Sequence, residues 1–178
     1  MGIFISMLNT VTDYNTRIAL GKSRELEVIE FLRGKGYKII EPTAQQDMHN
    51  KIDGFICPKL GGRLSFQLKQ RESQSDIIFE IIKDWDRNIE GRDLQSDADL
   101  YIIVDRYGHV NIFNTKEIKK KALELLKLAD GNPNNQSGEG WELKFTQDLS
   151  HHNTKLMAFF KPSLFHIIAS HIIPDYNN

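Results

Sequence analysis

The stretch RLSFQLKQRES, from Arg63 to Ser73, alternates like a β-strand and lacks the period of a helix. Its apolar residues Leu64, Phe66 and Leu68 occupy every second position, so in a strand they share one face. The opposite face is polar, and its residues are Arg63, Ser65, Gln67, Lys69 and Arg71. A strand of this kind turns its polar side either to solvent or to a functional surface.

The segment before this strand predicts its partner. KIDGFIC, Lys51 to Cys57, has the composition of a second strand, and PKLGG, Pro58 to Gly62, has the residues of a turn. Two strands joined in this way predict a hairpin, in which residues of the two strands can converge on one face.

The rest of the chain predicts alternating helices and strands. Gly36 is expected to stop the first helix, and Asn114 to Glu117 have the form of a capping box that starts a later one. We expect helices at 20–35, 76–89, 114–129 and 161–173, strands at 37–41, 100–104, 110–113 and 141–146, and loops at 42–50 and 130–140. This order predicts an α/β fold with a mixed β-sheet flanked by helices.

Composition sets limits on the class of protein. The 178 residues are enough for one domain, which we expect to span 1–178, and the net charge of −1 neither indicates nor excludes a nucleic-acid partner. A single cysteine, Cys57, fits a reducing cytoplasm. No apolar run has membrane-spanning length, and the opening MGIFISMLNT lacks the basic region of a signal peptide. A cytoplasmic protein without membrane contact is the expectation.

Glu25 stands in an unusual position on the first predicted helix. It precedes Val28, Ile29 and Leu32 by three, four and seven residues, which places it near the middle of the apolar face. A carboxylate there is costly unless it has a partner, a cation or water. The alternative is a first-turn acid that has already turned to solvent.

Asp53 lies inside the strand that spans 51–57, where aspartate is depleted. Gly54 beside it has no side chain, and glycine in a strand often marks a close approach by another group. The alternative is an Asp-Gly turn, which the strand-like residues on both sides make less attractive. If the strand continues, Asp53 can converge with Gln67 and Lys69 across the hairpin.

These residue types together suggest a metal site. A carboxylate and an amide oxygen are hard ligands of the kind that Mg²⁺ takes. A lysine beside the cation can orient or activate a water molecule and offset developing negative charge. Lys69 is therefore expected to serve chemistry, so that Lys69→Ala stays folded and loses activity. By the same reasoning, Gln67→Glu is expected to bind Mg²⁺ more tightly.

The pattern resembles the PD-(D/E)XK nuclease superfamily. The residues that carry the resemblance are Glu25 in GKSRELEVIEFLRGKGY, Asp53 in KIDGFI, and Gln67-Leu68-Lys69 in LSFQLKQR. The first stretch is similar to the opening helix of archaeal Holliday-junction resolvases, and IDG followed by QxK is similar to Mrr-like restriction endonucleases. The likeness covers residues 20–104, and 105–178 would form a C-terminal extension.

The resemblance implies a restriction-endonuclease-like αβββαβ core and a Mg²⁺-dependent DNA endonuclease, with Mn²⁺ able to substitute. Asp53, the Gln67 side chain and the Leu68 carbonyl would hold the metal, Glu25 directly or through water, and Lys69 would serve the nucleophilic water. Two departures stand out: Ile52 replaces the usual proline, and glutamine replaces the commoner glutamate, which removes one negative charge.

Further expectations concern partners, and two rival interpretations stay open. Arg71, beyond Lys69 on the same strand, is a candidate contact for a DNA phosphate. Symmetric cutting of two strands would favour a homodimer. The first rival is a non-catalytic nucleic-acid-binding or assembly domain that retains the nuclease fold. The second is an α/β protein whose polar strand face is solvated.

Overall fold

The structure is a computed structural model that describes residues 22–58, 61–71, 76–128, 136–148 and 151–174. The chain divides into two compact units, Met1–Ile39 (unit 1) and Ile40–Asn178 (unit 2). The segment MGIFISMLNT and residues 130–135 of the predicted loop lie outside the described residues. In the part of the chain that is described, no helix is long and apolar enough to cross a membrane.

Unit 1 contains the first predicted helix. Residues 22–34 are helical, which confirms the prediction over the described part, while residues 20 and 21 lie outside it. Its buried stripe consists of Val28, Ile29 and Leu32. Glu25 is half-buried, and Glu27 and Glu30 are exposed, as the helical period predicts. The short strand β1 (Lys38–Ile40) follows where a strand was expected.

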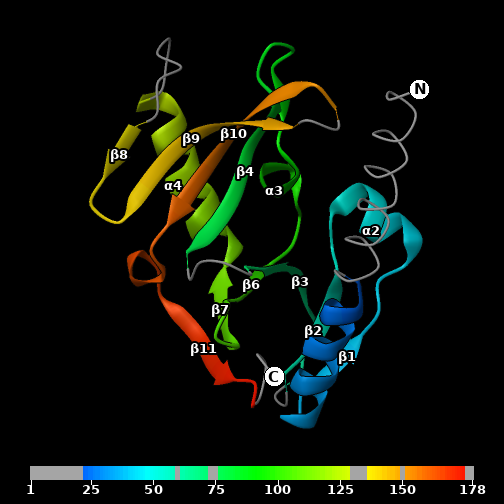
Figure 1. Ribbon diagram of the computed structural model, residues 1–178. Helices are drawn as coiled ribbons and strands as arrows, with labels where there is room; N and C mark the ends of the chain where they lie inside the picture. Colours follow the sequence, from blue (N-terminus) through cyan, green and yellow to red (C-terminus); the bar gives the residue numbers. More distant parts are fainter. Residues whose placement is uncertain (1–21, 59–60, 72–75, 129–135, 149–150, 175–178) are drawn as a thin grey trace, which may run out of the picture. The chain divides into compact units, whose positions relative to one another are not determined.

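The first sheet of unit 2 is mixed (Figure 1). Its strands lie in the order β2 (Gly54–Cys57), β3 (Leu64–Gln70), β6 (Leu100–Val104), β7 (His109–Asn114) and β11 (Ile167–Ile172). Strands β2 and β3 form the predicted antiparallel hairpin, and β3 runs parallel to β6. Parallel neighbours need a long crossover, so the segment between β3 and β6 must leave the sheet and return.

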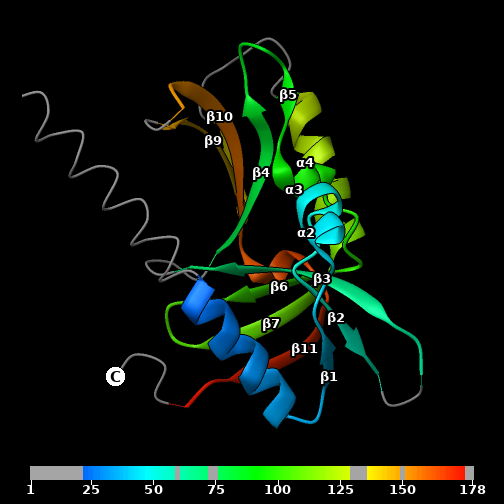
Figure 2. The same cartoon turned by 90° about the vertical axis from the view of Figure 1, so that its right-hand side faces the viewer.

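The second sheet of unit 2 is antiparallel, and two of its strands, β4 and β5, belong to that crossover. Its order is β5 (Ile89–Glu90), β4 (Ile77–Asp84), β10 (Asn153–Phe160), β9 (Trp141–Asp148) and β8 (Gln136–Gly138). Figure 2 shows helix α4 (Thr115–Leu128) beside β4, on the side away from β10. The shorter helices are α2 (Ala44–Asn50), α3 (Arg92–Gln95) and the 3₁₀ turn Pro162–Leu164.

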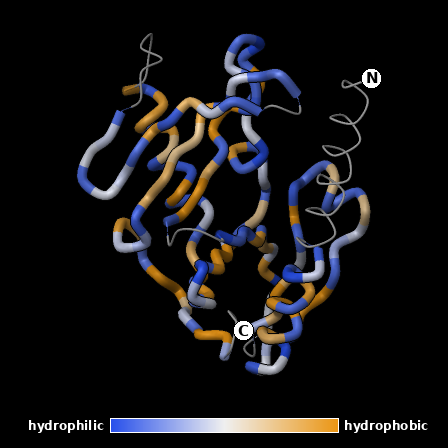
Figure 3. Tube along the Cα trace, in the orientation of Figure 1, coloured by the Kyte–Doolittle hydropathy of each residue, from blue (hydrophilic) through white to orange (hydrophobic). Residues whose placement is uncertain are grey.

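The main core of unit 2 joins the two sheets and α4. Fully buried members include Phe79 of β4, Tyr101 of β6, Phe113 of β7, Ile118 of α4 and Phe160 of β10. In Figure 3 the turn between β4 and β5, at the top of the view, is hydrophilic (blue), as expected for an exposed connection. Burial of such large side chains is the main stabilising contribution here.

The prediction of a mixed α/β fold is confirmed, but the predicted helix at 76–89 is wrong. Ile77–Asp84 form strand β4, in which Ile77, Phe79 and Ile81 are buried at strand spacing. The run IIFEIIKD is rich in β-branched and aromatic residues, and its pairing with β10 stabilises the extended form.

Further local predictions are wrong. The strand expected at 51–57 begins only at Gly54, because Lys51 ends helix α2 in a left-handed conformation, and residues 136–138 of the predicted loop form β8. Part of the predicted loop at 42–50 is helix α2, because Thr43 and Gln46 form a capping box that satisfies the first backbone groups of the helix. The predicted helix at 161–173 is instead a 3₁₀ turn followed by β11, which pairs antiparallel with β7. Its isoleucines favour a strand once a neighbouring edge is free to pair with them.

Candidate functional site

The polar face of β3 is buried, so it is not a solvated surface. Gln67 has no exposed area and Ser65 only 6%. The Lys69 side chain is 25% exposed and that of Arg71 16%. The interpretation of this face as plain solvent is therefore wrong, because the crossover between β3 and β6 covers it.

Each of these polar side chains contacts an aspartate of that crossover. The Ser65 hydroxyl donates to Asp99 Oδ2 over 2.7 Å. Both Gln67 and Lys69 contact Asp93, and Arg71 pairs with Asp76 at 2.9 Å. Buried polar groups need such partners to offset their lost hydration. The polar face and the crossover thus form one hydrogen-bonded layer.

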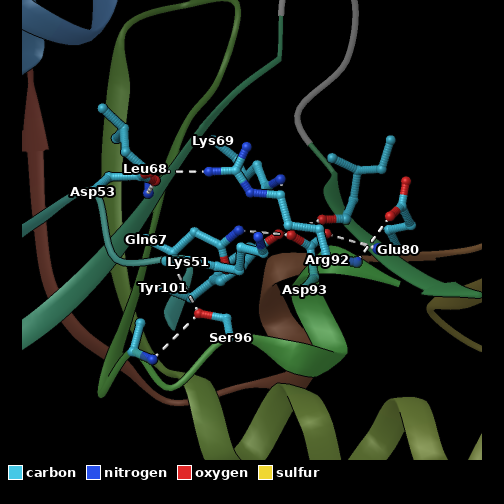
Figure 4. Close-up of polar contacts among 12 residues, drawn as sticks. Lys51, Asp53, Gln67, Leu68, Lys69, Glu80, Arg92, Asp93, Ser96 and Tyr101 are labelled. Atoms are coloured by element: carbon cyan, nitrogen blue, oxygen red, sulfur yellow. Dashed lines mark hydrogen bonds and ion pairs between the residues drawn. The ribbon is translucent and has the colours of Figure 1, made fainter. Parts of the chain in front are cut away.

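Asp93 is the centre of this layer and was missed by the sequence analysis. Its Oδ1 accepts from Gln67 Nε2 and pairs with Lys69 Nζ, each at 2.8 Å, and its Oδ2 accepts from the Glu80 N–H at 2.7 Å (Figure 4). The Asp93 side chain is 2% exposed. In sequence it resembles an ordinary first-turn acid of the helix that follows Gly91, and nothing local marks it as buried.

Asp53 lies beside the same strand. Its Oδ2 accepts from the Leu68 N–H at 2.7 Å, which ties the carboxylate to the backbone between Gln67 and Lys69. Its Oδ1 lies 3.3 Å from a guanidinium nitrogen of Arg92. Burial raises the pKa of the Asp53 carboxyl from its ordinary value, although the Leu68 bond and the charges of Arg92 and Lys69 act in the opposite direction. The charged form therefore benefits from any further cation.

Gly54 confirms the expected close approach beside Asp53. A Cβ atom at this position would lie 2.4 Å from Cζ of Phe66 on the neighbouring strand. The ring of Phe66 occupies that space and is fully buried. Glycine therefore lets β2 approach β3, and the Asp53 N–H donates to the Phe66 carbonyl at 2.8 Å. The alternative of an isolated Asp-Gly turn is wrong.

Gln67 has one polar atom that the layer does not satisfy. Its Nε2 donates to Asp93, but its Oε1 is buried and has no hydrogen-bond partner among the described residues. An unpartnered buried oxygen is unfavourable and is often explained by a missing water or ion. This atom is therefore the strongest single sign of a ligand on the polar face of β3.

Arg92 and Glu80 extend the network towards the surface. The Arg92 side chain is 47% exposed, so its contact with Asp53 is open to water. The Arg92 N–H donates to Glu80 Oε1 at 2.8 Å, and Glu80 Oε2 lies 3.2 Å from Lys155 Nζ. Two buried carboxylates, Asp53 and Asp93, thus face two cations, of which only Arg92 is substantially exposed.

The remaining predicted residues have separate surroundings. Glu25 lies in unit 1, so its role at the site stays a prediction from the sequence. Arg71 is paired with Asp76 and lies 5.6 Å from the ring centroid of Phe159. Within the described ranges, no group of three or more His, Cys, Asp or Glu side chains could hold a metal ion. A metal here would therefore need the Gln67 oxygen and backbone oxygens as well as Asp53.

The chain was compared with family models, curated proteins and solved structures, and none of these comparisons gave a match.

Proposed function

We propose that this protein is a metal-dependent DNA phosphodiesterase that acts as an endonuclease. The observation that carries the proposal is the buried Oε1 of Gln67, which has no hydrogen-bond partner among the described residues. The N–H of Leu68, the next residue of β3, donates to the Asp53 carboxylate. Asp53 directly precedes β2, Gln67 and Lys69 belong to the paired strand β3, and Asp93 connects these last two through its Oδ1. Such convergence of a carboxylate, an amide oxygen and a lysine suits phosphate chemistry.

The strand arrangement is compatible with the restriction-endonuclease-like core that the proposal includes. That core expects a hairpin carrying the aspartate and the QxK strand, followed by a crossover to a parallel strand. Here β2 and β3 form the hairpin and β6 lies parallel to β3. The crossover departs from the expected helix, since it consists of β4, β5 and α3.

The residues fit a hard divalent cation such as Mg²⁺ or Mn²⁺. The Asp53 carboxylate, the Gln67 amide oxygen and the Leu68 carbonyl would supply oxygen ligands. Each Asp53 oxygen has one partner and a further lone pair, so a cation would compete for the carboxylate with the positive charge of the exposed Arg92. Its exposure makes that exchange inexpensive.

In the proposed mechanism Asp53, Gln67 and the Leu68 carbonyl would hold a divalent cation, which would supply Lewis-acid chemistry for the phosphate and for a water molecule. The residues of the chain prepare this chemistry. Asp53 and Gln67 hold and orient the centre, and Lys69 directs its ammonium group to the attacking water or to the developing negative charge. The contact between Lys69 and Asp93 keeps that ammonium group in place beside Gln67. Arg71 would help to hold a neighbouring DNA phosphate, and a homodimer would serve symmetric cutting of two strands.

The direct test is nicking of supercoiled plasmid DNA with Mg²⁺ or Mn²⁺, and with a chelator. The wild type should nick in the presence of metal and stop with the chelator. Lys69→Ala should be inactive, while Lys121→Ala should retain activity because that lysine pairs with Glu124 on the exposed face of α4. Wild-type protein that leaves the plasmid intact at every metal concentration would reject the proposal.

One observation favours the non-catalytic alternative, a nucleic-acid-binding or assembly domain. Ser65, Gln67, Lys69 and Arg71 all have aspartate partners, so most of this face is satisfied without any ligand. In that case the protein would shift DNA in a gel without cutting it, and the shift would not require metal. DNA binding that survives Asp53→Asn, together with absent nicking by the wild type, would favour this alternative.

A further inference from the structure

Asp93 contacts both polar residues of the QxK motif at the same oxygen. Its Oδ1 lies 2.8 Å from Gln67 Nε2 and 2.8 Å from Lys69 Nζ. Its second oxygen is held by the Glu80 N–H, so the carboxylate is fixed between β3 and β4. A carboxylate fixed in this way can orient the groups that donate to it, here the Gln67 amide and the Lys69 ammonium group.

These contacts explain why glutamine is suitable at position 67. The amide has one donor and one acceptor end, and because Asp93 accepts from Nε2, Oε1 is directed away from Asp93. A glutamate at this position would have no hydrogen to donate. It would bring two carboxylates to within hydrogen-bonding distance in a buried place, and such a pair cannot both be ionised without a large penalty.

We propose that Asp93 is the positioning residue of this site. It orients the Gln67 amide so that Oε1 is available as a ligand, holds the ammonium group of Lys69, and carries the negative charge that the commoner glutamate would carry at position 67. This inference rests on the proposed function. It also reverses the expectation from sequence for Gln67→Glu, which now should weaken metal binding as long as Asp93 is present.

The amide at position 67 and the carboxylate at position 93 should therefore tolerate exchange only when both are changed together. In Asp93→Asn the side-chain amide has a single oxygen, which can accept either from the Glu80 N–H or from Gln67 Nε2. The Asn NH₂ group then faces the other donor, and this pair of donors cannot form a hydrogen bond. Rotation of the Gln67 amide would relieve the conflict but would turn Oε1 toward Asn and Nε2 into the ligand position. Adding Gln67→Glu removes this conflict, because the glutamate carboxylate accepts from the new amide. It also gives the Lys69 ammonium group a carboxylate in place of Asp93 and keeps an oxygen available for the metal.

The experiment compares wild type, Q67E, D93N and the double variant Q67E/D93N. Isothermal titration with Mn²⁺ alone gives the affinity, thermal unfolding without metal confirms folding, and plasmid nicking gives activity. D99N is the matched control, because Asp99 also accepts from the polar face of β3, but through Ser65. It should lose stability and keep its Mn²⁺ affinity.

We expect each single variant to bind Mn²⁺ roughly tenfold or more weakly, the effect of one hydrogen bond to a charged group. The double variant should return to within about threefold of wild type, the usual scatter of additive effects. A D93N protein that binds Mn²⁺ and nicks DNA like wild type overturns the inference and leaves the proposed function intact. Wild type without any Mn²⁺ binding overturns both. If D93N does not fold, Q67E decides alone, since tighter binding than wild type contradicts the role of Asp93.

Discussion

Removal of the Lys69 charge should destabilise the protein as well as inactivate it. Lys69 Nζ lies 2.8 Å from Oδ1 of Asp93, whose side chain is 2% exposed. In Lys69→Met the side chain keeps its length and apolar stem, but Asp93 loses its cation. The carboxylate then relies on the Gln67 amide, the Glu80 N–H and the neighbouring Tyr101 side chain. The sequence had suggested a purely chemical role for Lys69, with stability left to its apolar neighbours.

The size of the effect follows from burial. Breaking a fully buried ion pair costs about 3–5 kcal/mol, because one charge is left without compensation. The Lys69 side chain is 25% exposed, so water can partly replace it beside Asp93. We therefore expect a loss of about 2–3 kcal/mol in the free energy of unfolding. For a chain of this length that corresponds to a decrease in Tm of roughly 5–10 °C.

Urea unfolding followed by circular dichroism, without metal, measures this loss. The control is Lys121→Met, which breaks a 3.4 Å pair with Glu124 on the exposed face of α4 and should cost less than about 0.5 kcal/mol. If Lys69→Met unfolds at the same urea concentration as wild type, Asp93 does not depend on this lysine and the burial argument is wrong.

Other predictions concern neighbouring residues. Burial raises the pKa of the Asp53 carboxyl in the folded protein above its ordinary value of 3.8. The carboxyl group therefore contributes less to stability as the pH rises from 3.8 through the raised pKa. Over that range, urea titrations should show the stability of Asp53→Asn increasing relative to wild type. Arg92→Ala should bind Mn²⁺ roughly fivefold more tightly by calorimetry, because a cation that competes for Asp53 by about 1 kcal/mol is removed; unchanged affinity would contradict that competition. Gly91→Ala should lower Tm and Mn²⁺ affinity together, because its Cβ would lie 2.2 Å from the Glu80 carbonyl oxygen and displace α3; a lower Tm with intact affinity would separate α3 from the site.

Local patterns were sufficient for the elements whose partners are close in sequence. The hairpin of β2 and β3 followed from alternation and turn residues, and α4 followed from its start at Asn114, whose side chain accepts from the Lys116 N–H. The buried strand β6 was evident from its continuous apolar run. In these segments propensity, capping and burial all favour the same structure, so a single sequence is enough.

Prediction failed where distant pairing decides the structure. The run Ile77–Asp84 was assigned to a helix, and its pairing with β10, more than 70 residues later, makes it a strand. The candidate site shows the same division. Gln67 and Lys69 were identified from the alternation of one strand, and Asp53 from its unusual place beside Gly54 in the neighbouring segment. Asp93 becomes visible only when the crossover returns over β3. Nothing in GRDLQS distinguishes its aspartate from a solvated one.

The crossover also explains why the outer face of β3 is polar at all. A parallel pairing of β3 with β6 requires a connection that leaves the sheet, and this chain uses β4 on the way out and α3 on the return. The return is fixed to β4 by the Gly91 N–H, which donates to the Ile81 carbonyl at 2.8 Å. The aspartates of the crossover then need hydrogen-bond donors on the sheet that they cover, and the polar side chains of β3 supply these donors. Structural need therefore accounts for the donors of this face. On this face Gln67 Oε1 stays buried without a partner among the described residues, as Thr115 Oγ1 and Asn153 Oδ1 do elsewhere in the fold. The case for chemistry depends on that acceptor, because among these unpartnered atoms it belongs to the side chain that shares Asp93 Oδ1 with Lys69.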